Sequence, residues 1–409
     1  MNLQTIIKSH YLAAIFLVAF ITASIYLTLD NESILYTAIN KEQKTDEQQR
    51  TIARNDSFSI CNLFSGRWVF DNKSYPLYNE RQCSFLLNQS FTCEKYGRKD
   101  TKYQNWRWQP HGCDIPRFNG TTLLEKIRGK RLLFVGDSVN RNQWISMLCL
   151  IEPFLHQSTA KLVINKGNSF TFLATGYNAT IGFYWSPFLV ESNCDDPVNH
   201  LMRERIIKIK AIEEHARHWS DADILIFDSF AWWTQQTMTL LWGSFGSSDA
   251  IYKKVNMKLR RYEMGLNTWS DWLEININRT KTKLFFMSLS PLHFGDERWG
   301  VEQNCYNQTE PISEEGYWVE ASTREMMRIA ESIIHNLEKR GVKVKYLNIT
   351  HLSEYRKDAH PSIYTKFANK VREKQLANLK SYSDCLHWCL PGVPDVWNQI
   401  LYSYIINYS

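Results

Sequence analysis

Four short apolar, β-branched runs alternate with long helical patterns over most of the chain, and this alternation limits the fold more than any other feature. The strand-like runs are 131–135 (RLLFV), 224–227 (ILIF), 283–287 (KLFFM) and 342–347 (VKVKYL). The helical patterns between and beside them are 141–151, 251–275 and 321–340. Strands that alternate with helices are typical of a parallel sheet covered by helices on both faces. The sequence therefore predicts one large α/β domain over residues 58–409, with long insertions.

An uncharged segment near the N-terminus predicts a membrane anchor. Residues 11–29 (YLAAIFLVAFITASIYLTL) contain no charged side chain, and a helix of this length reaches about 28 Å, close to the thickness of the hydrocarbon core. Lys8 precedes the segment, whereas Asp30 and Glu32 follow it, which favours a cytosolic N-terminus. A cleavable signal peptide is the alternative, although its apolar core is usually shorter. We expect a cytosolic tail (1–10), a type II single-pass anchor and a luminal remainder.

The remainder carries features of the secretory pathway. Residues 30–57 are polar, lack periodicity and predict a flexible stem. The chain contains ten Asn-x-Ser/Thr sequons, more than its composition explains. Seven of them are candidates for glycosylation of the luminal domain: Asn72, Asn88, Asn119, Asn178, Asn278, Asn307 and Asn348. Three others lie nearer the ends of the chain, at Asn31, Asn55 and Asn407.

The nine cysteines predict disulfide bonds. Eight are disulfide candidates, five in the first part of the folded region and three near its end: Cys61, Cys83, Cys93, Cys113, Cys149, Cys305, Cys385 and Cys389. We expect bridges that tie the N-terminal segment to the C-terminal one and leave Cys194 as the odd thiol. No Cys-x-x-Cys pair occurs, so we expect no metal site. The net charge of +6 is mild and no basic cluster stands out, so nucleic acid is not an expected partner.

A candidate nucleophile follows the first predicted strand. Gly136, Asp137 and Ser138 lead directly into a helical stretch, which places Ser138 at the carboxyl edge of the sheet, where open α/β folds bind ligands. A backbone N–H at a helix N-terminus can also stabilise an oxyanion. The Gly-x-Ser-x-Gly elbow of α/β-hydrolases is absent. The alternative is that Ser138 only begins the helix, with Asp137 favouring the helix start.

A serine nucleophile needs a base with an orienting carboxylate, and the C-terminal region offers one. Asp384 and His387 stand at i, i+3 spacing with a cysteine on each side of His387, so they can share one side of a turn. Asp358 and His360 form a second candidate pair with shorter spacing. Two other histidines lack a carboxylate at a useful spacing, namely His111 and His293. The occurrence of Asp-x-x-His together with Gly-Asp-Ser favours Ser138, His387 and Asp384 as a catalytic triad.

These two motifs resemble the signature of GDSL-type (SGNH-like) acyl hydrolases, and the surrounding sequence resembles the plant trichome birefringence-like family of polysaccharide O-acetyltransferases. The matching stretches include CNLFSGRWVFDNKSYPLY from Cys61, RGKRLLFVGDSVNRNQWISMLC from Arg128 and DCLHWCLPGVPDVWNQIL from Asp384. Others begin at Tyr103, Leu241, Tyr262 and Leu347. The resemblance covers nearly the whole luminal part. The Trp232-Trp233 pair, LWGSFG and SLSPLHFGDERWG are similar to the branch associated with xylan acetylation.

The resemblance implies an SGNH-like α/β fold, disulfide-stabilised, with a parallel sheet, flanking helices and long insertions that form a second lobe. It also implies a Golgi membrane enzyme that transfers acetyl groups onto xylan through an acetyl-Ser138 intermediate. His387 would be the base and Asp384 its orienter. The enzyme would hold no bound cofactor but would need an acetyl donor, acetyl-CoA or a carrier derived from it. Golgi acetylation proteins or glycosyltransferases are expected partners. A polysaccharide acetylesterase and a non-catalytic polysaccharide-binding or scaffold protein are the alternatives.

Further residues are candidates for oxyanion or substrate contacts. They are Gly136, Asp137, Arg141, Asp228, Trp232, Trp233 and Trp388, with Arg107, Trp106 and Trp108 as further possibilities. A Trp face can stack on a sugar ring, and core packing is the alternative for each Trp. A structural ion pair is the alternative for each Arg. The chain departs from the family pattern at Asp228, where Asn is usual, and at 302–303, where a Gly is usual nearby.

Overall fold

The computed structural model describes residues 61–407, apart from residues 88, 156–160, 236, 295–303, 314–316, 318–320 and 367–378. The expected tail, anchor and stem lie outside the described residues, as do Asn31, Asn55, Asn88 and the departure at 302–303. Among the helices of the described ranges, none combines the length and apolar character that a bilayer crossing requires. Residues 62–409 form one compact unit.

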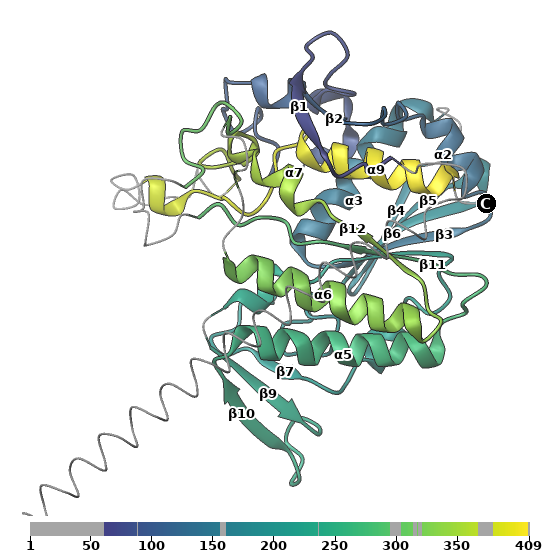
Figure 1. Cartoon of the computed structure of the whole chain (residues 1–409), viewed down its shortest axis with the longest axis vertical. Coiled ribbons are helices and arrows are strands. Elements are labelled where there is room, and N and C mark those ends of the chain that lie inside the picture. Colours follow the sequence, from purple (N-terminus) through teal and green to yellow (C-terminus); the bar gives the residue numbers. More distant parts are fainter. Residues whose placement is uncertain are drawn as a thin grey trace, which may run out of the picture. The chain divides into compact units, whose positions relative to one another are not determined.

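A seven-stranded sheet forms the centre of this unit (Figure 1). Its strand order is β12-β11-β8-β3-β6-β5-β4. The five strands from β12 to β6 are mutually parallel: β12 (Val344–Leu347), β11 (Lys283–Met287), β8 (Ile224–Phe227), β3 (Arg131–Gly136) and β6 (Ala179–Trp185). The α/β class and the mostly parallel sheet are thus confirmed. The sheet also has an antiparallel extension that the sequence analysis does not predict, because β5 (Ser169–Ala174) pairs antiparallel with both β6 and β4 (Lys161–Lys166).

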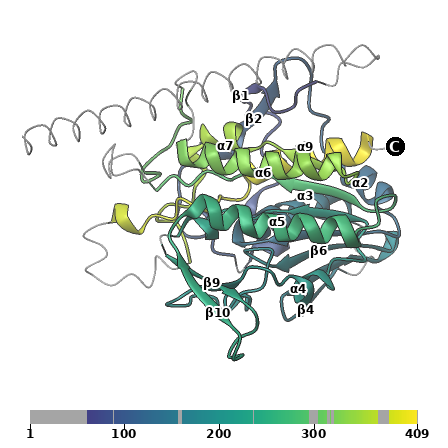
Figure 2. The same cartoon turned by 60° about the horizontal axis from the view of Figure 1, so that its bottom comes forward.

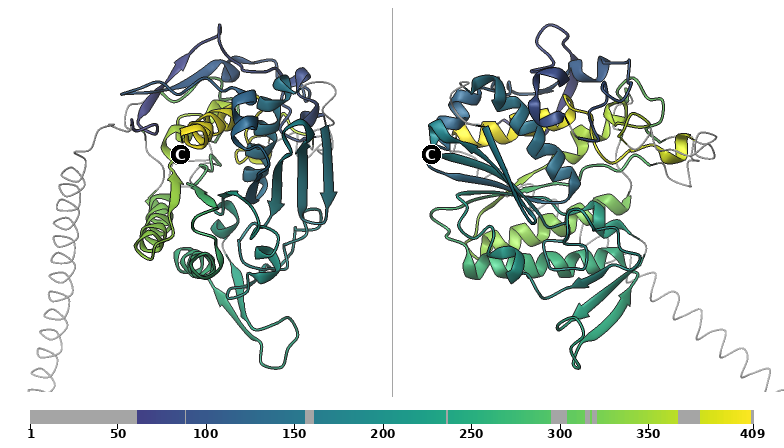
Figure 3. Two further views of the ribbon diagram at one scale, coloured as in Figure 1. Left: turned by 90° about the vertical axis from the view of Figure 1, so that its right-hand side faces the viewer. Right: turned by 180° about the vertical axis from the view of Figure 1, so that it is seen from behind.

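Helices cover both faces of the sheet. On one face α3 (Ser138–Ile151) packs on α9 (Val393–Asn407), which also contacts α2 (Gly120–Lys126) (Figure 3). On the other face α5 (Lys258–Asn276) and α6 (Ala321–Lys339) lie side by side (Figure 2). The alternation of side chains along β11 explains this arrangement, because Phe285 contacts Tyr404 of α9 whereas Phe286 contacts Trp269 of α5.

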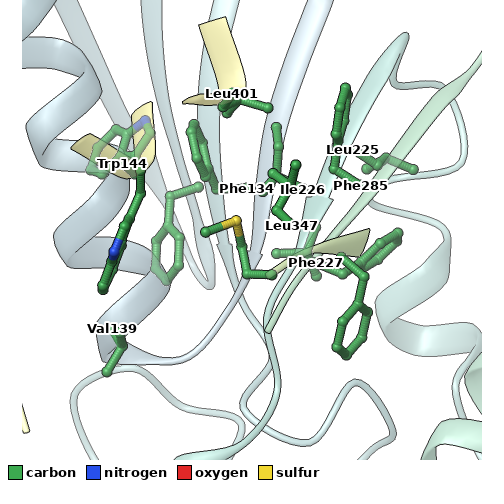
Figure 4. Close-up of a cluster of buried hydrophobic side chains, with 14 of the residues drawn as sticks. Phe134, Val139, Trp144, Leu225, Ile226, Phe227, Phe285, Leu347 and Leu401 are labelled. Atoms are coloured by element: carbon green, nitrogen blue, oxygen red, sulfur yellow. The ribbon is translucent and has the colours of Figure 1, made fainter. Parts of the chain in front are cut away.

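The parallel strands are buried on both sides, as such strands usually are. All four residues of β8 and five of the six in β3 are buried. Figure 4 shows Phe134, Ile226, Phe285 and Leu347 of four neighbouring strands in one cluster, with Trp144 of α3 at the side of Phe134. This core holds the carboxyl ends of β3 and β8 next to each other, where the segments that follow them can form a site.

The insertions carry two smaller sheets. β1 (Gly66–Phe70) pairs antiparallel with β2 (Trp106–Pro110). A second sheet has the order β10-β9-β7, formed by β10 (Ile251–Val255), β9 (Met238–Trp242) and β7 (Ile206–Lys208). The prediction of a helix over 251–275 is wrong at its start, because 251–255 pairs with β9 and the helix begins only at Lys258. Two short α-helices, α4 (Glu213–Ala216) and α7 (Thr350–Glu354), and several short 3₁₀ helices lie between the larger elements.

Disulfides join segments that are far apart in sequence. Cys93 is bonded to Cys389, Cys83 to Cys149, and Cys305 to Cys385. Cys61 and Cys113 are also disulfide-bonded. Cys194 is a buried free thiol. The Cys93–Cys389 bond links the N-terminal part of the folded region to its C-terminal part across 296 residues, which agrees with the disulfide-stabilised fold that the sequence predicts.

The glycosylation candidates differ in exposure. Five are exposed in the described chain: Asn72, Asn119, Asn178, Asn278 and Asn307. Asn348 is partly buried, and its side-chain oxygen is buried. Attachment of a glycan needs an accessible amide, so Asn348 is the least suited of the six.

Candidate active site

Ser138 is the first residue of α3, directly after strand β3. Asp137 caps the helix, because its Oδ1 accepts a hydrogen bond of 2.8 Å from the backbone N–H of Val139. Gly136 is required by space, since a Cβ there would lie 2.5 Å from the carbonyl oxygen of Asp228 at the end of β8. The residue that caps the helix is therefore Asp137 and not Ser138. The Ser138 hydroxyl is left available for other contacts.

Asp384 organises the turn that carries His387. Its Oδ1 accepts hydrogen bonds from the backbone N–H groups of Leu386 (3.1 Å) and His387 (3.0 Å). Its Oδ2 lies 2.8 Å from Nδ1 of the His387 ring. Cys385 and Cys389 flank His387, and the disulfide bond that each of them forms fixes one end of this turn. The i, i+3 spacing therefore acts as the sequence predicts, because one carboxylate fixes both the turn and the imidazole.

Ser138 and His387 meet across 249 residues of sequence. His387 Nε2 lies 2.8 Å from Ser138 Oγ. Because the carboxylate of Asp384 accepts a hydrogen bond from Nδ1–H, the neutral ring presents Nε2 as an acceptor to the hydroxyl. The His387 and Asp384 side chains remain partly accessible, at 21% and 24%, so a small substrate can approach them. The arrangement can deprotonate Ser138 and activate it as a nucleophile.

The charges of this pair stabilise one another. Burial disfavours the imidazolium, but the Asp384 carboxylate outweighs burial, and the pKa of His387 is raised above its usual value. Burial opposes ionisation of Asp384 too, yet His387 and the hydrogen bonds to the turn lower the pKa of Asp384. The base is thus paired with a permanently ionised carboxylate, which favours the imidazolium that forms when Ser138 loses its proton.

Two further carboxyl groups lie close to the site. Burial raises the pKa of Asp137 to about 6, although its hydrogen bond from Val139 and the nearby His387 act in the opposite direction. Burial and the proximity of Asp137 raise the pKa of Asp228 well above its usual range. Asp228 therefore holds its proton more readily than an exposed aspartate, and in this form it is neutral, like the Asn that the family resemblance leads one to expect at this position.

The tryptophan candidates are packing residues. Trp233 and Trp388 are fully buried, and their indole N–H groups donate to Ser229 and Ser290. Trp232 is 8% exposed and its ring meets aromatic neighbours edge-on. The burial of all three matches the core-packing alternative rather than a face open to a sugar ring. Trp108 is likewise buried and donates to a backbone carbonyl, whereas Trp106 is partly buried.

The two arginine candidates differ. Arg107 pairs with Asp71 at 3.4 Å, which matches the structural alternative. Arg141 lies one turn after Ser138 on α3, with its guanidinium 5.4 Å from the ring centre of Phe170. Its Nε has no hydrogen-bond partner among the described residues, and burial lowers its pKa. Arg141 is therefore a cation one turn from Ser138 that remains a candidate for substrate binding.

The second candidate pair, Asp358 and His360, does not contact Ser138. Asp358 accepts two hydrogen bonds of 2.9 Å from Arg356. His360 contacts the backbone of His387 rather than Ser138.

Sequence reasoning missed Asn142, whose side-chain oxygen accepts from the backbone N–H of Trp388 at 2.8 Å and ties α3 to the His387 turn. No local pattern marks this contact, because the two residues are 246 positions apart. Within the described ranges, no cluster of His, Cys, Asp or Glu could hold a metal ion.

A mostly parallel sheet with a serine at the end of a central strand, and a His–Asp turn near the C-terminus, defines the SGNH-like class of acyl-transferring proteins. Residues 115–404 match the model of the PC-Esterase family, described as a GDSL/SGNH-like acyl-esterase family found in Pmr5 and Cas1p. Residues 59–114 match the PMR5 N-terminal domain. The chain belongs to this family.

Named plant proteins are similar over most of their length. Protein trichome birefringence-like 34 of Arabidopsis thaliana is 50% identical over 92% of this chain and 93% of its own. Xylan O-acetyltransferase 14 of Oryza sativa is 48% identical over 85% of this chain and 77% of its own length. Xylan O-acetyltransferase 12 of the same species is 50% identical over 86% of this chain and 71% of its own length. The resemblance to the trichome birefringence-like family is thus confirmed.

Proposed function

We propose that this protein is an O-acetyltransferase that moves acetyl groups onto xylosyl residues of xylan through an acetyl-Ser138 intermediate. The observation that carries the proposal is the pair of 2.8 Å contacts that connect Ser138, His387 and Asp384. The names of the similar rice proteins support the acceptor. An acyltransferase needs an activated nucleophile and a base that can act twice, and these three side chains supply both.

The first half of the reaction acetylates the serine. His387 Nε2 takes the proton of Ser138 as Oγ attacks the carbonyl carbon of the acetyl donor. The tetrahedral intermediate collapses with cleavage of the bond between that carbon and the donor's leaving atom. His387 returns the proton to the leaving group. Asp384 stays ionised throughout and stabilises the imidazolium.

The second half transfers the acetyl group to the sugar. A xylosyl hydroxyl loses its proton to His387 and attacks the acetyl-Ser138 ester, and the regenerated Ser138 takes the proton back. The proposal assigns the oxyanion of both halves to the backbone N–H of Ser138, at the start of α3. A transferase differs from an esterase only in that the sugar hydroxyl, rather than water, is held at the ester.

The setting of the reaction follows the sequence-based expectations. The acetyl donor is acetyl-CoA or an acetyl carrier derived from it. The proposal places the enzyme in the Golgi membrane with its catalytic domain in the lumen, anchored by residues 11–29. That segment is uncharged and long enough to span a bilayer. Other Golgi enzymes of polysaccharide synthesis are the proposed partners.

The test is an acetyl-transfer assay with the purified full chain. Product masses are measured with an acetyl donor, with and without xylo-oligosaccharide, and with mannan, xyloglucan and pectin oligosaccharides as competing acceptors. We expect acetylated xylo-oligosaccharide from the protein and from Ser248→Ala, a control at an exposed serine, and none from Ser138→Ala. Acetate release that is indifferent to the sugar would instead identify an esterase, and transfer by Ser138→Ala would exclude Ser138 as the nucleophile.

A further inference from the structure

The turn that carries Asp384 and His387 lies against a second segment, residues 359–362. Asp384 and Ser362 exchange two backbone hydrogen bonds, of 2.9 and 3.0 Å. The backbone N–H of Cys389 donates to the carbonyl of Ala359 at 3.0 Å. The 359–362 segment thus follows the turn from its first residue to its last.

A third segment holds the turn through His293. The backbone N–H of His293 donates to the carbonyl of Cys385 at 3.1 Å. The carbonyl of His293 accepts from the backbone N–H of Cys305 at 3.1 Å, and Cys305 is itself bonded to Cys385. The turn is therefore placed between two backbone segments, each of which contributes a histidine.

The two histidine side chains meet behind the turn. His293 Nδ1 lies 2.7 Å from His360 Nε2, and His360 Nδ1 lies 2.6 Å from the carbonyl oxygen of His387. The side chains are buried, with His293 3% and His360 1% exposed. A continuous chain of hydrogen bonds thus leads from His293 through His360 to the backbone of His387.

The partners determine where the protons of this chain reside. A carbonyl oxygen only accepts, so His360 Nδ1 is the donor to His387. Burial and the neighbouring His293 lower the pKa of His360 well below its usual value, which keeps the ring neutral and makes its Nε2 an acceptor. His293 Nδ1 must then carry a proton.

The surroundings fix this pair further. His293 Nε2 faces Glu354 Oε1 at 3.6 Å. The guanidinium of Arg98 donates to the carbonyl of His360 at 2.9 Å. The His360 ring stacks on Trp388 with 4.0 Å between ring centroids, and the backbone N–H of Trp388 is held by Asn142 of α3. The other charged groups near His360 are Asp384 and His387 themselves.

We propose that His360, held in place by His293, is a positioning residue for acetyl transfer: by donating to the carbonyl of His387 it fixes the backbone from which the imidazole reaches Ser138. This inference rests on the proposed function, and it adds a role for two histidines that lie outside the triad. His387 Nε2 must stay within hydrogen-bonding distance of Ser138 Oγ, and small displacements of a reacting group are costly in rate.

Three substitutions of His360 separate the two hydrogen bonds. His360→Asn retains a donor near the Nδ1 position and loses the contact with His293. His360→Gln retains a polar atom near the Nε2 position and loses the bond to His387. His360→Phe loses both but keeps a ring on Trp388. His335→Phe and His335→Asn, at an exposed histidine of α6, are the matched controls.

The full chain and each variant are compared by kcat and KM for xylo-oligosaccharide, by the pH profile of kcat/KM and by thermal melting. A fluorophosphonate probe reports the reactivity of Ser138 independently of the acceptor. We expect His360→Phe and His360→Gln to lose about 10- to 100-fold in kcat and in labelling rate with KM unchanged. His360→Asn should recover most of this loss. The acidic limb of the pH profile should move to lower pH in His360→Phe, because a displaced ring loses part of the Asp384 effect.

Three results would overturn the inference. A folded His360→Phe with the kcat of the unsubstituted protein would show that the bond to His387 has no positioning effect. His360→Asn that is as slow as His360→Phe would show that the donor at Nδ1 is not the cause. If His360→Phe does not melt cooperatively, the labelling rates of two His293 variants are compared instead. The proposal requires His293→Phe to be labelled more slowly than His293→Asn, and equal labelling rates would reject it. Absence of both labelling and transfer in the unsubstituted protein would instead reject the proposed function, on which the inference depends.

Discussion

Replacing Asp384 by Asn removes one charge with little change in shape, and its consequence can be worked out from the hydrogen bonds. Oδ1 accepts from two backbone N–H groups, at 3.1 and 3.0 Å. An amide NH₂ placed there would face two donors, so the amide oxygen must keep this position. The NH₂ then occupies the position of Oδ2, 2.8 Å from His387 Nδ1. Because NH₂ donates, Nδ1 must become the acceptor, and the ring proton moves to Nε2.

This tautomer cannot serve Ser138. Nε2 carries a proton where it must accept one, 2.8 Å from Oγ. The expected loss is about 10⁴-fold in kcat, or about 5 kcal/mol in activation free energy. The pH profile should change as well. Since Asp384 raises the pKa of His387, kcat/KM of the unsubstituted protein falls as the pH drops through that raised pKa. In Asp384→Asn the acidic limb should move to lower pH.

The assay is acetyl transfer to xylo-oligosaccharide by the full chain over a range of pH, with Asp271→Asn, a largely exposed aspartate of α5, as the control. Melting curves establish that both variants are folded. Asp384→Asn with a kcat within about threefold of the unsubstituted protein, and with the same acidic limb, would refute the assignment of Asp384 as the group that orients His387.

Three further substitutions test the structure around the site. Gly136→Ala should lower stability by about 1–3 kcal/mol and reduce transfer, because its Cβ would lie 2.5 Å from the backbone oxygen of Asp228, the residue after β8; unchanged melting and activity would contradict this. The double substitution Cys93→Ala/Cys389→Ala opens a loop of 296 residues and should lower the free energy of unfolding in urea by about 2–4 kcal/mol; an unchanged urea midpoint would exclude that contribution. Trp388→Phe should cost about 1–2 kcal/mol, because Ser290 loses a hydrogen-bond donor, without raising KM for xylo-oligosaccharide. A raised KM at unchanged stability would instead indicate that the Trp388 ring binds sugar.

The parallel core of the fold could be predicted because its strands are buried on both faces and therefore appear as continuous apolar runs. The runs at 224–227 and 283–287 coincide with β8 and β11. The apolar runs do not predict the antiparallel β4–β5 extension, although Gly167 in the left-handed region (φ 58°) lies in the turn between its strands. The sequence predicts a helix from residue 251, where the structure has strand β10, because this strand is exposed on both faces and shows no apolar periodicity of its own.

The proposed site was predictable to the extent that its parts are local. The cap by Asp137 and the i, i+3 contact between Asp384 and His387 follow from spacing within a single turn. Packing is not local: Trp233 and Trp388 were candidates for sugar stacking but are buried by elements distant in sequence. The contact of His360 with the backbone of His387 depends on the arrangement of several segments, so no pattern near His360 reveals it.

The central claim is that Ser138 carries the acetyl group between donor and sugar. The most direct measurement is mass analysis of the Ser138 peptide after a brief incubation of the full chain with acetyl donor, followed by a chase with xylo-oligosaccharide. The account predicts one added acetyl group on Ser138 that is lost in the chase as acetylated oligosaccharide appears, and none in Ser138→Ala. Transfer to the sugar without any acetyl group on Ser138, or with undiminished yield in Ser138→Ala, would contradict it.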